Sequence, residues 1–279
     1  MKEIINKFRK LQGKHDLWLI YSDFLEIMAI SVANSTERIF NKKRFEERES
    51  EYFRIIKKYT KDELTTFAEI YADIVILQDK NIKKGNGYQD ILGSLLMQLE
   101  LGNKWNGQFF TPDSIANLMA KMSLDEKRLK ETIEKDGFVL GVDEAVGGGV
   151  TMLGLANTML DLGYNPQKQL FIVCGDLDRK SCFMTYIQLA MAGIGAIVKN
   201  QDALRKDILK NSIDPMDSWV TPSFYMNGWK YRLKYRKEKG KYEKFFKEIE
   251  KKKKDEEVKK EYTQISFLYE EINAKNNKK

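Results

Sequence analysis

The stretch "FVLGVDEAVGGGVTMLGLANTMLDLGYNPQKQLFIVCGD", residues 138 to 176, decides the fold. It holds two short apolar runs that each end in an acid, with a helical pattern of apolar residues between them. A second helical pattern and a third apolar run ending in an acid follow it. The predicted strands are 138–143, 169–176 and 196–202, and the predicted helices are 151–164 and 179–194. This alternation predicts an α/β fold with right-handed crossovers and a parallel sheet.

An acid stands at the end of each predicted strand, namely Asp143, Asp176 and Asp202. Ligands of parallel sheets bind at the carboxyl ends of the strands, so these side chains are candidate ligand contacts. Three glycines, Gly147 to Gly149, follow the first acid and let a ligand approach the backbone. The spaced glycines of a dinucleotide site and the Lys-Ser/Thr pair of a phosphate loop are both missing from the sequence, which argues against a phosphate ligand.

The chemistry of these positions fits S-adenosylmethionine as a cofactor. Asp143 can accept from an ammonium group, close to the backbone N–H groups of the helix that starts near Thr151. Asp176 can accept from two ribose hydroxyls, and Leu177 beside it offers an apolar surface to the adenine ring. Asp202 can accept from the adenine amino group. The alternative is that each acid only caps the helix that follows it.

The rest of the chain divides into further parts. Residues 1–98 predict a helical N-terminal domain, whose first apolar stripe is Leu17, Ile20, Tyr21, Phe24, Ile27, Met28 and Val32. Residues 99–235 form the predicted α/β domain. Its last segment, "WKYRLKYR" (229–236), alternates strictly and predicts a strand with one apolar face and one cationic face. Residues 236–279 predict a charged helical tail.

The tail carries most of the net charge. It holds 15 Lys and Arg against 10 Asp and Glu, which gives +5 of the total net charge of +7. A basic tail favours a polyanionic partner such as DNA. Its mixed charges fit a solvated, salt-bridged helix equally well.

Composition argues for a cytoplasmic protein without a metal site. Two cysteines, Cys174 and Cys182, are too few for a disulfide framework, and with the single His15 they argue against an internal zinc site. A lone histidine also argues against a Ser-His-Asp triad. The first residues lack the apolar core of a signal peptide, and no apolar run is expected to reach the ~18 residues of a membrane span.

The segment "NGQFFTPDSIANLMAKM" (106–122) adds a family resemblance. It resembles the Gly-Gln-Phe-Phe/Tyr-Thr-Pro segment of N6-adenine DNA methyltransferases, particularly the modification subunits of type I restriction systems. The upstream "DILGSLLMQLELGNKW" is also similar to that family, as are "DEAVGGG", "CGDLD" and "NQDAL". In the glycine turn Asp143, Gly147 and Gly149 match the family, whereas Glu144, Val146 and Gly148 differ. The resemblance covers about half of the chain.

The resemblance implies a Rossmann-like methyltransferase sheet that binds S-adenosylmethionine. The residues that it implies at the methionine end of the cofactor are Gln108, Phe109, Phe110, Thr111 and Pro112. The sheet is expected to be truncated, because only 55 residues follow Phe224. The chain shows no target-recognition domain, so DNA specificity would come from a partner subunit or be weak.

The segment "TPSF" (221–224) stands where the family has Asn-Pro-Pro-Phe/Tyr. The resemblance implies that Thr221 and Pro222 face the target amino group and that Phe224 stacks on a flipped base. A Thr hydroxyl is a poorer acceptor than an Asn amide oxygen, and Ser223 replaces the second proline, so the loop is degenerate. We expect the loop at the carboxyl end of a central strand beside the first strand, with Phe224 exposed in a cleft. A plain turn would bury Phe224.

The leading hypothesis is therefore a DNA methyltransferase that transfers a methyl group to adenine N6. The alternative from another class is an inactive module that keeps the fold and binds DNA or a protein partner in a regulatory, defence or anti-defence role. A methyltransferase with a small-molecule substrate is a third possibility, because the fold alone does not fix the substrate.

Overall fold

The computed structural model describes residues 1–13, 15–101, 111–209, 217–241 and 244. The chain separates into two units, residues 1–229 and residues 230–279, and each is described by itself. The predicted boundary between residues 98 and 99 lies inside the first unit and stays a prediction. The prediction of an α/β fold with a helical N-terminal region is confirmed.

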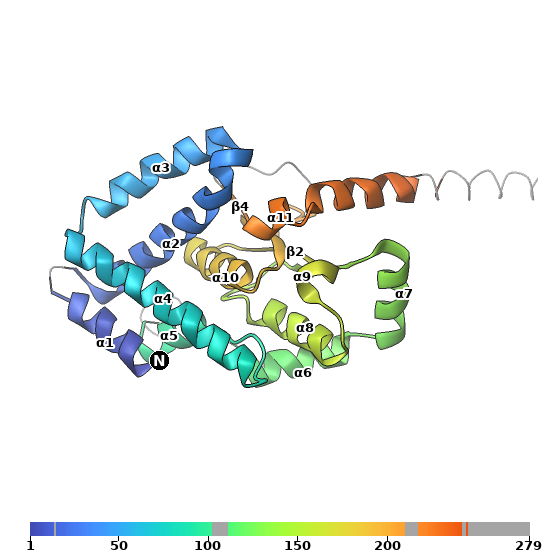
Figure 1. Cartoon of the computed structure of the whole chain (residues 1–279), viewed down its shortest axis with the longest axis horizontal. Helices are drawn as coiled ribbons and strands as arrows, with labels where there is room; N and C mark the ends of the chain where they lie inside the picture. Colours follow the sequence, from blue (N-terminus) through green and yellow to red (C-terminus); the bar gives the residue numbers. More distant parts are fainter. Residues whose placement is uncertain (14, 102–110, 210–216, 242–243, 245–279) are drawn as a thin grey trace, which may run out of the picture. The chain divides into compact units, whose positions relative to one another are not determined.

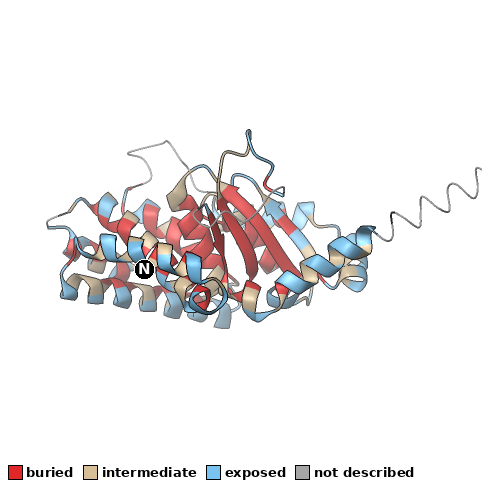
Figure 2. Cartoon of the chain, turned by 90° about the horizontal axis from the view of Figure 1, so that it is seen from above, coloured by how far each residue is buried: buried red, intermediate tan, exposed pale blue. Residues whose placement is uncertain are grey.

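The first unit is built on one four-stranded sheet of mixed direction. Its strands are β1 (Val139–Asp143), β2 (Leu170–Asp176), β3 (Gly195–Asn200) and β4 (Ser218–Val220), in the spatial order β1-β2-β3-β4. β1, β2 and β3 run parallel, in a register that pairs Asp143 with Cys174 and Asp176 with Asn200. The acids that end β1 and β2 therefore lie at the same edge of the sheet. Strands β2, β3 and β4 are largely buried, whereas β1 buries Gly141 and exposes Leu140 and Val142 (Figure 2).

Helices α8 (Val150–Asp161) and α10 (Arg179–Met191) connect the parallel strands. They cover one face of the sheet. A Cβ on Gly141 of β1 would meet the Leu155 side chain of α8 at 2.9 Å, so the helix packs directly on that strand. Phe183 of α10 packs edge-on against Trp219 of β4 with ring centroids 5.0 Å apart. The short helix α9 (Pro166–Gln169) leads into β2.

The helical N-terminal region consists of α1 (Lys2–Leu11), α2 (Leu17–Phe40), α3 (Lys42–Ile56), α4 (Lys61–Lys83) and α5 (Ile91–Gln98). Their apolar stripes pack together and against α10, which lies beside α2 (Figure 1). The buried Tyr21 hydroxyl of α2 donates to the Leu92 carbonyl of α5 at 2.8 Å. Helices α6 (Asp113–Ser123) and α7 (Glu126–Asp136) lead into β1, and α6 packs on α8. The last element of this unit is α11 (Pro222–Met226).

Helix α2 corrects the expectation that no segment has the length of a membrane span. It has 24 residues, and the mean hydropathy of its most apolar window is 1.3. By length and composition alone, the helix is therefore long and apolar enough to cross a membrane. Two thirds of this window, 67%, is buried inside the protein. The helix is apolar on several sides because it packs against α1, α3, α10 and α11. A core helix of this kind gives only weak evidence for a membrane span.

The position of β4 differs from the prediction that it lies next to the first strand. It pairs with β3 in antiparallel direction, with Val198 opposite Trp219. Arg48 of α3 fixes this arrangement, because its guanidinium donates to the Ser218 carbonyl at 2.8 Å and lies 3.8 Å from the Trp219 ring centroid. Arg48 also forms a buried ion pair with Glu37. A strand of three residues has few pairing groups, so contacts from a distant helix decide its place.

The prediction of a strand at 229–236 is wrong. Residues 229–241 are helical. Strict alternation favours a strand, but Leu, Lys and Arg are good helix formers and the segment continues into more of them. The cations Lys230, Arg232, Lys234 and Arg236 consequently do not share one face, because residues two apart point to different sides of a helix.

Candidate cofactor site at the glycine turn

The glycine turn between β1 and α8 adopts a conformation that favours glycine. Gly147 and Gly149 have φ angles of 55° and 95°, in the left-handed region. A Cβ on Gly149 would also lie 3.0 Å from the Thr185 hydroxyl and 3.2 Å from the Thr185 Cα of α10. Both the backbone angle and the close approach of α10 therefore select glycine here, as the resemblance implies.

Asp143 and Asp176 are bound to this turn. The Asp143 carboxylate accepts from the Thr151 hydroxyl at 2.5 Å and from the Ala145 N–H at 3.0 Å. The Asp176 carboxylate accepts from the Gly147 N–H at 2.9 Å and from the Asp178 N–H at 2.9 Å. The Val146 N–H donates to the Gly175 carbonyl at 3.0 Å. The ends of β1 and β2 and the glycine turn thus form one hydrogen-bonded cluster.

The alternative that these two acids only cap helices is wrong. The N-cap of α8 is Gly149, which has no side chain, and the N-cap of α10 is Asp178, whose carboxylate accepts from the Ser181 N–H at 3.1 Å. Asp143 and Asp176 are half-buried, and each carboxylate has about four acceptor positions, so both keep capacity for a ligand. The first N–H groups of α8 likewise receive no side-chain cap.

The end of β3 is joined to the same edge. The Asn200 amide donates to the backbone carbonyls of Asp176 and Leu177 at 3.1 and 2.9 Å. The Leu177 side chain is 74% exposed, as an apolar surface for a ring requires. Asp202, two residues beyond β3, accepts from the Leu204 N–H at 3.0 Å and pairs with Arg205 at 3.2 Å. Asp202 is thus engaged within its own loop, whereas Asp143 and Asp176 are engaged with the glycine turn.

Helix α10 holds the turn from the side of the core. The Thr185 hydroxyl donates to the Gly147 carbonyl at 2.8 Å, and the Gln188 amide donates to the Gly148 carbonyl at 2.6 Å. The same Gln188 nitrogen donates to the Asp90 carboxylate at 2.8 Å. Burial raises the pKa of Asp90 to about 6, against the opposing effect of the Gln188 and Gly93 hydrogen bonds.

Sequence reasoning missed these supporting residues. Thr151 stands two residues after Gly149, and its hydroxyl in the first turn of the following helix could have been recognised from the sequence as a partner of Asp143. Thr185, Gln188 and Asp90 gave no such signal, because Asp90 and Gln188 are 98 residues apart in the chain and meet only through the fold.

The predicted Gly-Gln-Phe-Phe-Thr-Pro segment is described only at its end. Gln108, Phe109 and Phe110 lie outside the described residues. Thr111 is half-buried, and Pro112 is the N-cap residue of α6. Asp113 then accepts from the Asp90 N–H at 3.0 Å. Helix α6 fits closely on α8, since a Cβ on Gly154 would lie 2.9 Å from the Ala116 carbonyl oxygen.

The expected position of the catalytic loop is wrong. Because β4 is antiparallel, Thr221 lies at the amino end of β3, on the edge of the sheet opposite to Asp176. The Thr221 hydroxyl is fully buried, accepts from the Ala196 N–H at 2.8 Å and donates to the Ile194 carbonyl at 2.8 Å. Phe224 is 7% exposed and packs on Phe171 with ring centroids 6.0 Å apart. In this arrangement Thr221 is the N-cap residue of α11, and Pro222 and Phe224 lie in that short helix rather than in a base-binding loop.

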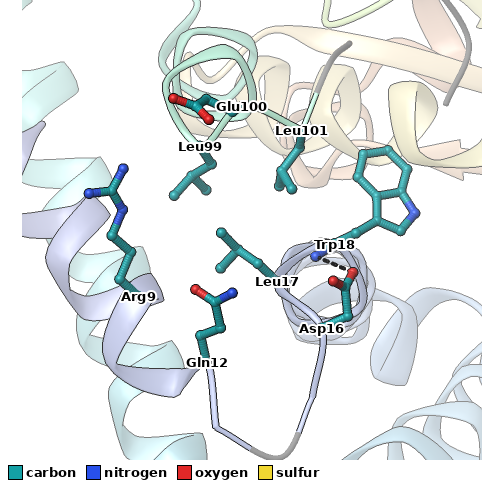
Figure 3. Close-up of a pocket in the computed structure, with 8 residues that line it drawn as sticks. All are labelled: Arg9, Gln12, Asp16, Leu17, Trp18, Leu99, Glu100 and Leu101. Atoms are coloured by element: carbon teal, nitrogen blue, oxygen red, sulfur yellow. Dashed lines mark hydrogen bonds between the residues drawn. The ribbon is translucent and has the colours of Figure 1, made fainter. Parts of the chain in front are cut away.

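A separate cavity of about 560 Å³ lies between α1, the start of α2 and the end of α5 (Figure 3). Its lining includes Arg9, Gln12, Leu17 and Leu99, and it contains neither Asp143 nor Asp176. The cavity therefore does not coincide with the glycine-turn site. No group of three or more His, Cys, Asp or Glu is placed to hold a metal ion among the residues that the structure describes.

Comparison with known proteins supplies the family. The family model of N-6 DNA methylase matches residues 87–275. This range covers the glycine turn, all four strands and more than half of the chain. The chain belongs to the N-6 DNA methylase family. No curated protein sequence gives a significant match.

Among solved structures, this N-6 DNA methylase family member is similar to the type I restriction-modification system methyltransferase subunit from Streptococcus thermophilus. The identity is 16% and the TM-score is 0.39. The match covers 76% of this chain and 59% of the other. The chain thus spans less than two thirds of the length of that subunit.

Proposed function

We infer that this chain binds S-adenosylmethionine at the glycine turn and takes part in adenine N6 methylation of DNA. The observation that carries the proposal is the hydrogen bond from the Gly147 N–H to the Asp176 carboxylate, which fixes the turn beside a strand-end acid. Membership of the N-6 DNA methylase family supports the same cofactor and reaction.

The described residues fit the cofactor by their chemistry. Asp176 would accept from the ribose hydroxyls and Leu177 would cover one face of the adenine ring. Asp143 would attract the ammonium group, and the uncapped start of α8 favours the carboxylate of the methionine part. Thr111 and Pro112 remain proposed contacts at the methionine end, together with Gln108, Phe109 and Phe110. Asp202 is a weaker candidate, because Arg205 already pairs with its carboxylate.

The cofactor would supply an activated methyl group, and the acceptor would be the exocyclic N6 of adenine in DNA. The basic tail supports DNA as a partner, since residues 236–279 carry a net charge of +5. A separate specificity subunit is a proposed protein partner. The cytoplasm is the proposed compartment.

A second candidate function is a non-catalytic module that keeps the cofactor and binds DNA or a protein partner. The observation that favours it is the burial of Thr221 and Phe224 on the edge of the sheet opposite to Asp176. In this arrangement the loop can neither accept from a target amino group nor stack on a base. Methyl transfer would then need an acceptor site from other residues or from a partner chain.

One experiment in two stages separates these functions. The first stage titrates the full chain with S-adenosylmethionine by calorimetry. The second incubates it with labelled S-adenosylmethionine and mixed-sequence DNA, and counts label in the DNA. Binding with transfer supports the methyltransferase, and binding without transfer on any DNA supports the module. A folded protein that does not bind the cofactor contradicts both.

A further inference from the structure

Helix α10 orients two successive peptide groups of the glycine turn. Thr185 and Gln188 are three residues apart and therefore lie on one face of the helix. They donate to the carbonyls of Gly147 and Gly148, at 2.8 and 2.6 Å. In a trans peptide the carbonyl and the following N–H point in opposite directions. The N–H of Gly148 therefore points away from α10.

The Gln188 amide can take only one orientation in this network. Its nitrogen donates to the Gly148 carbonyl and to the Asp90 carboxylate, and its oxygen accepts from the Leu92 N–H at 3.2 Å. Turning the amide over would place its oxygen against two acceptors and its nitrogen against a donor. Gln188 is 2% exposed, so water cannot replace these partners.

Asp90 is the anchor that holds Gln188. It is 4% exposed, and its carboxylate also accepts from the Gly93 N–H at 2.8 Å, which caps α5. Its own N–H donates to the Asp113 carboxylate at the start of α6. The pair therefore joins α5, α6 and α10 to the glycine turn. Neither residue is close enough in sequence to the turn to serve it by local geometry.

We propose that Gln188, anchored by Asp90, is a positioning residue that holds the Gly147–Gly149 turn in the conformation that binds the cofactor. This inference rests on the proposed function, because it names what prepares the same site. Without the Gln188 amide, the Gly148 carbonyl would be buried without its donor and the turn would relax away from α10. The cofactor would then meet a turn that it must first reorder.

The protonation state of Asp90 gives the proposal a distinctive readout. The ionised carboxylate accepts a stronger hydrogen bond from Gln188 than the protonated group does. The pKa of Asp90 is raised to about 6, chiefly by burial. Among titratable groups of the packed elements, Asp113 of α6 raises this pKa. Tyr21 of α2 also faces Asp90, and burial together with the Asp90 charge raises the pKa of Tyr21 well above its usual value. Cofactor affinity should therefore fall as the pH drops through 6.

The test measures S-adenosylmethionine affinity of the full chain by calorimetry. Gln188→Met removes the amide at similar volume, and Gln167→Met is the matched control, since the Gln167 amide also donates to a backbone carbonyl, that of Ala192 at 3.0 Å. We expect at least tenfold weaker binding for Gln188→Met and less than a twofold change for Gln167→Met. Circular dichroism confirms that each variant is folded.

A pH series completes the test and serves alone if Gln188→Met does not fold. Wild type should bind several-fold more weakly at pH 5.5 than at pH 7.5, and Asp90→Asn, which cannot ionise, should lose this difference. Equal cofactor affinity of wild type and folded Gln188→Met overturns the inference. The same holds if Asp90→Asn shows the same pH dependence of cofactor affinity as wild type. Neither result contradicts the proposed cofactor site. Wild type that binds no S-adenosylmethionine overturns the proposed function itself.

Discussion

The backbone N–H of Gly147 donates to the carboxylate of Asp176 over 2.9 Å, which links the turn after β1 to the end of β2. The Asp143 carboxylate accepts from groups on both sides of the same turn. Three of the residues that sequence analysis assigned to a cofactor, Asp143, Gly147 and Asp176, therefore lie in one cluster. The predicted catalytic residues lie elsewhere, because β4 is antiparallel. The proposed cofactor site and the loop predicted to receive the target base therefore lie at opposite edges of the sheet.

Gly149→Ala tests the close approach of α10 to the turn. The control is Gly163→Ala, because Gly163 also has a left-handed φ, 80°, but no atom within 4 Å of an added Cβ. The backbone cost should be about 1–2 kcal/mol in both variants. The free energy of unfolding should fall further in Gly149→Ala than in Gly163→Ala, since the added Cβ would meet the Thr185 hydroxyl at 3.0 Å. Urea unfolding measures both, and equal losses would contradict the packing described for the turn.

Thr221→Val tests whether this side chain is structural. The substitution leaves the Ala196 N–H and the Ile194 carbonyl without their buried partner, so the free energy of unfolding should fall by about 1–3 kcal/mol. Thr221→Ser keeps the hydroxyl, so its free energy of unfolding should fall by less than that of Thr221→Val. Chemical denaturation gives the comparison. A Thr221→Val variant as stable as wild type would mean that the hydroxyl is free for another role.

The strands and the acids that end β1 and β2 were predictable because their signals are local. An apolar run that ends in an acid and a glycine turn needs only neighbouring residues. The direction of β4 was not predictable, because Arg48 reaches the Ser218 carbonyl from a helix 170 residues earlier. The helix over residues 229–241 was missed because eight alternating residues imitate a strand. Gln188 was missed because its partners come from α5 and from the glycine turn.

The stability of the protein should contain a pH-dependent contribution from Asp90. Its pKa is about 6 in the folded chain and near 3.8 when exposed, so the folded state holds the proton more tightly. Stability is therefore highest below pH 4 for this group and falls as the pH rises to 6, by roughly 3 kcal/mol.

Asp90→Asn removes this titration. Denaturant unfolding at pH 4.5 and pH 7.5 should show a smaller loss of stability toward neutral pH in Asp90→Asn than in wild type. All other groups are common to both proteins and cancel in the comparison. An identical pH dependence in the two proteins would contradict the buried, ionisable state of Asp90.

DNA binding by the basic tail should depend strongly on salt. If residues 236–279 contact phosphates, a plot of log K against log salt should have a slope of about −0.9 for each contact. Fluorescence anisotropy with labelled duplex DNA measures this slope. A full chain whose DNA affinity does not change with salt would indicate that the tail is a solvated helix with internally paired charges.

The most direct test of the account is a calorimetric titration of S-adenosylmethionine into wild type and into Asp176→Ala. Asp161→Ala is a surface control, because the exposed Asp161 carboxylate pairs with Lys121. The account predicts one site per chain in wild type and in the control. It predicts a loss of about 1–3 kcal/mol of binding free energy in Asp176→Ala, because the alanine removes a charged acceptor. Equal affinity in wild type and Asp176→Ala, or no binding by folded wild type, would contradict it.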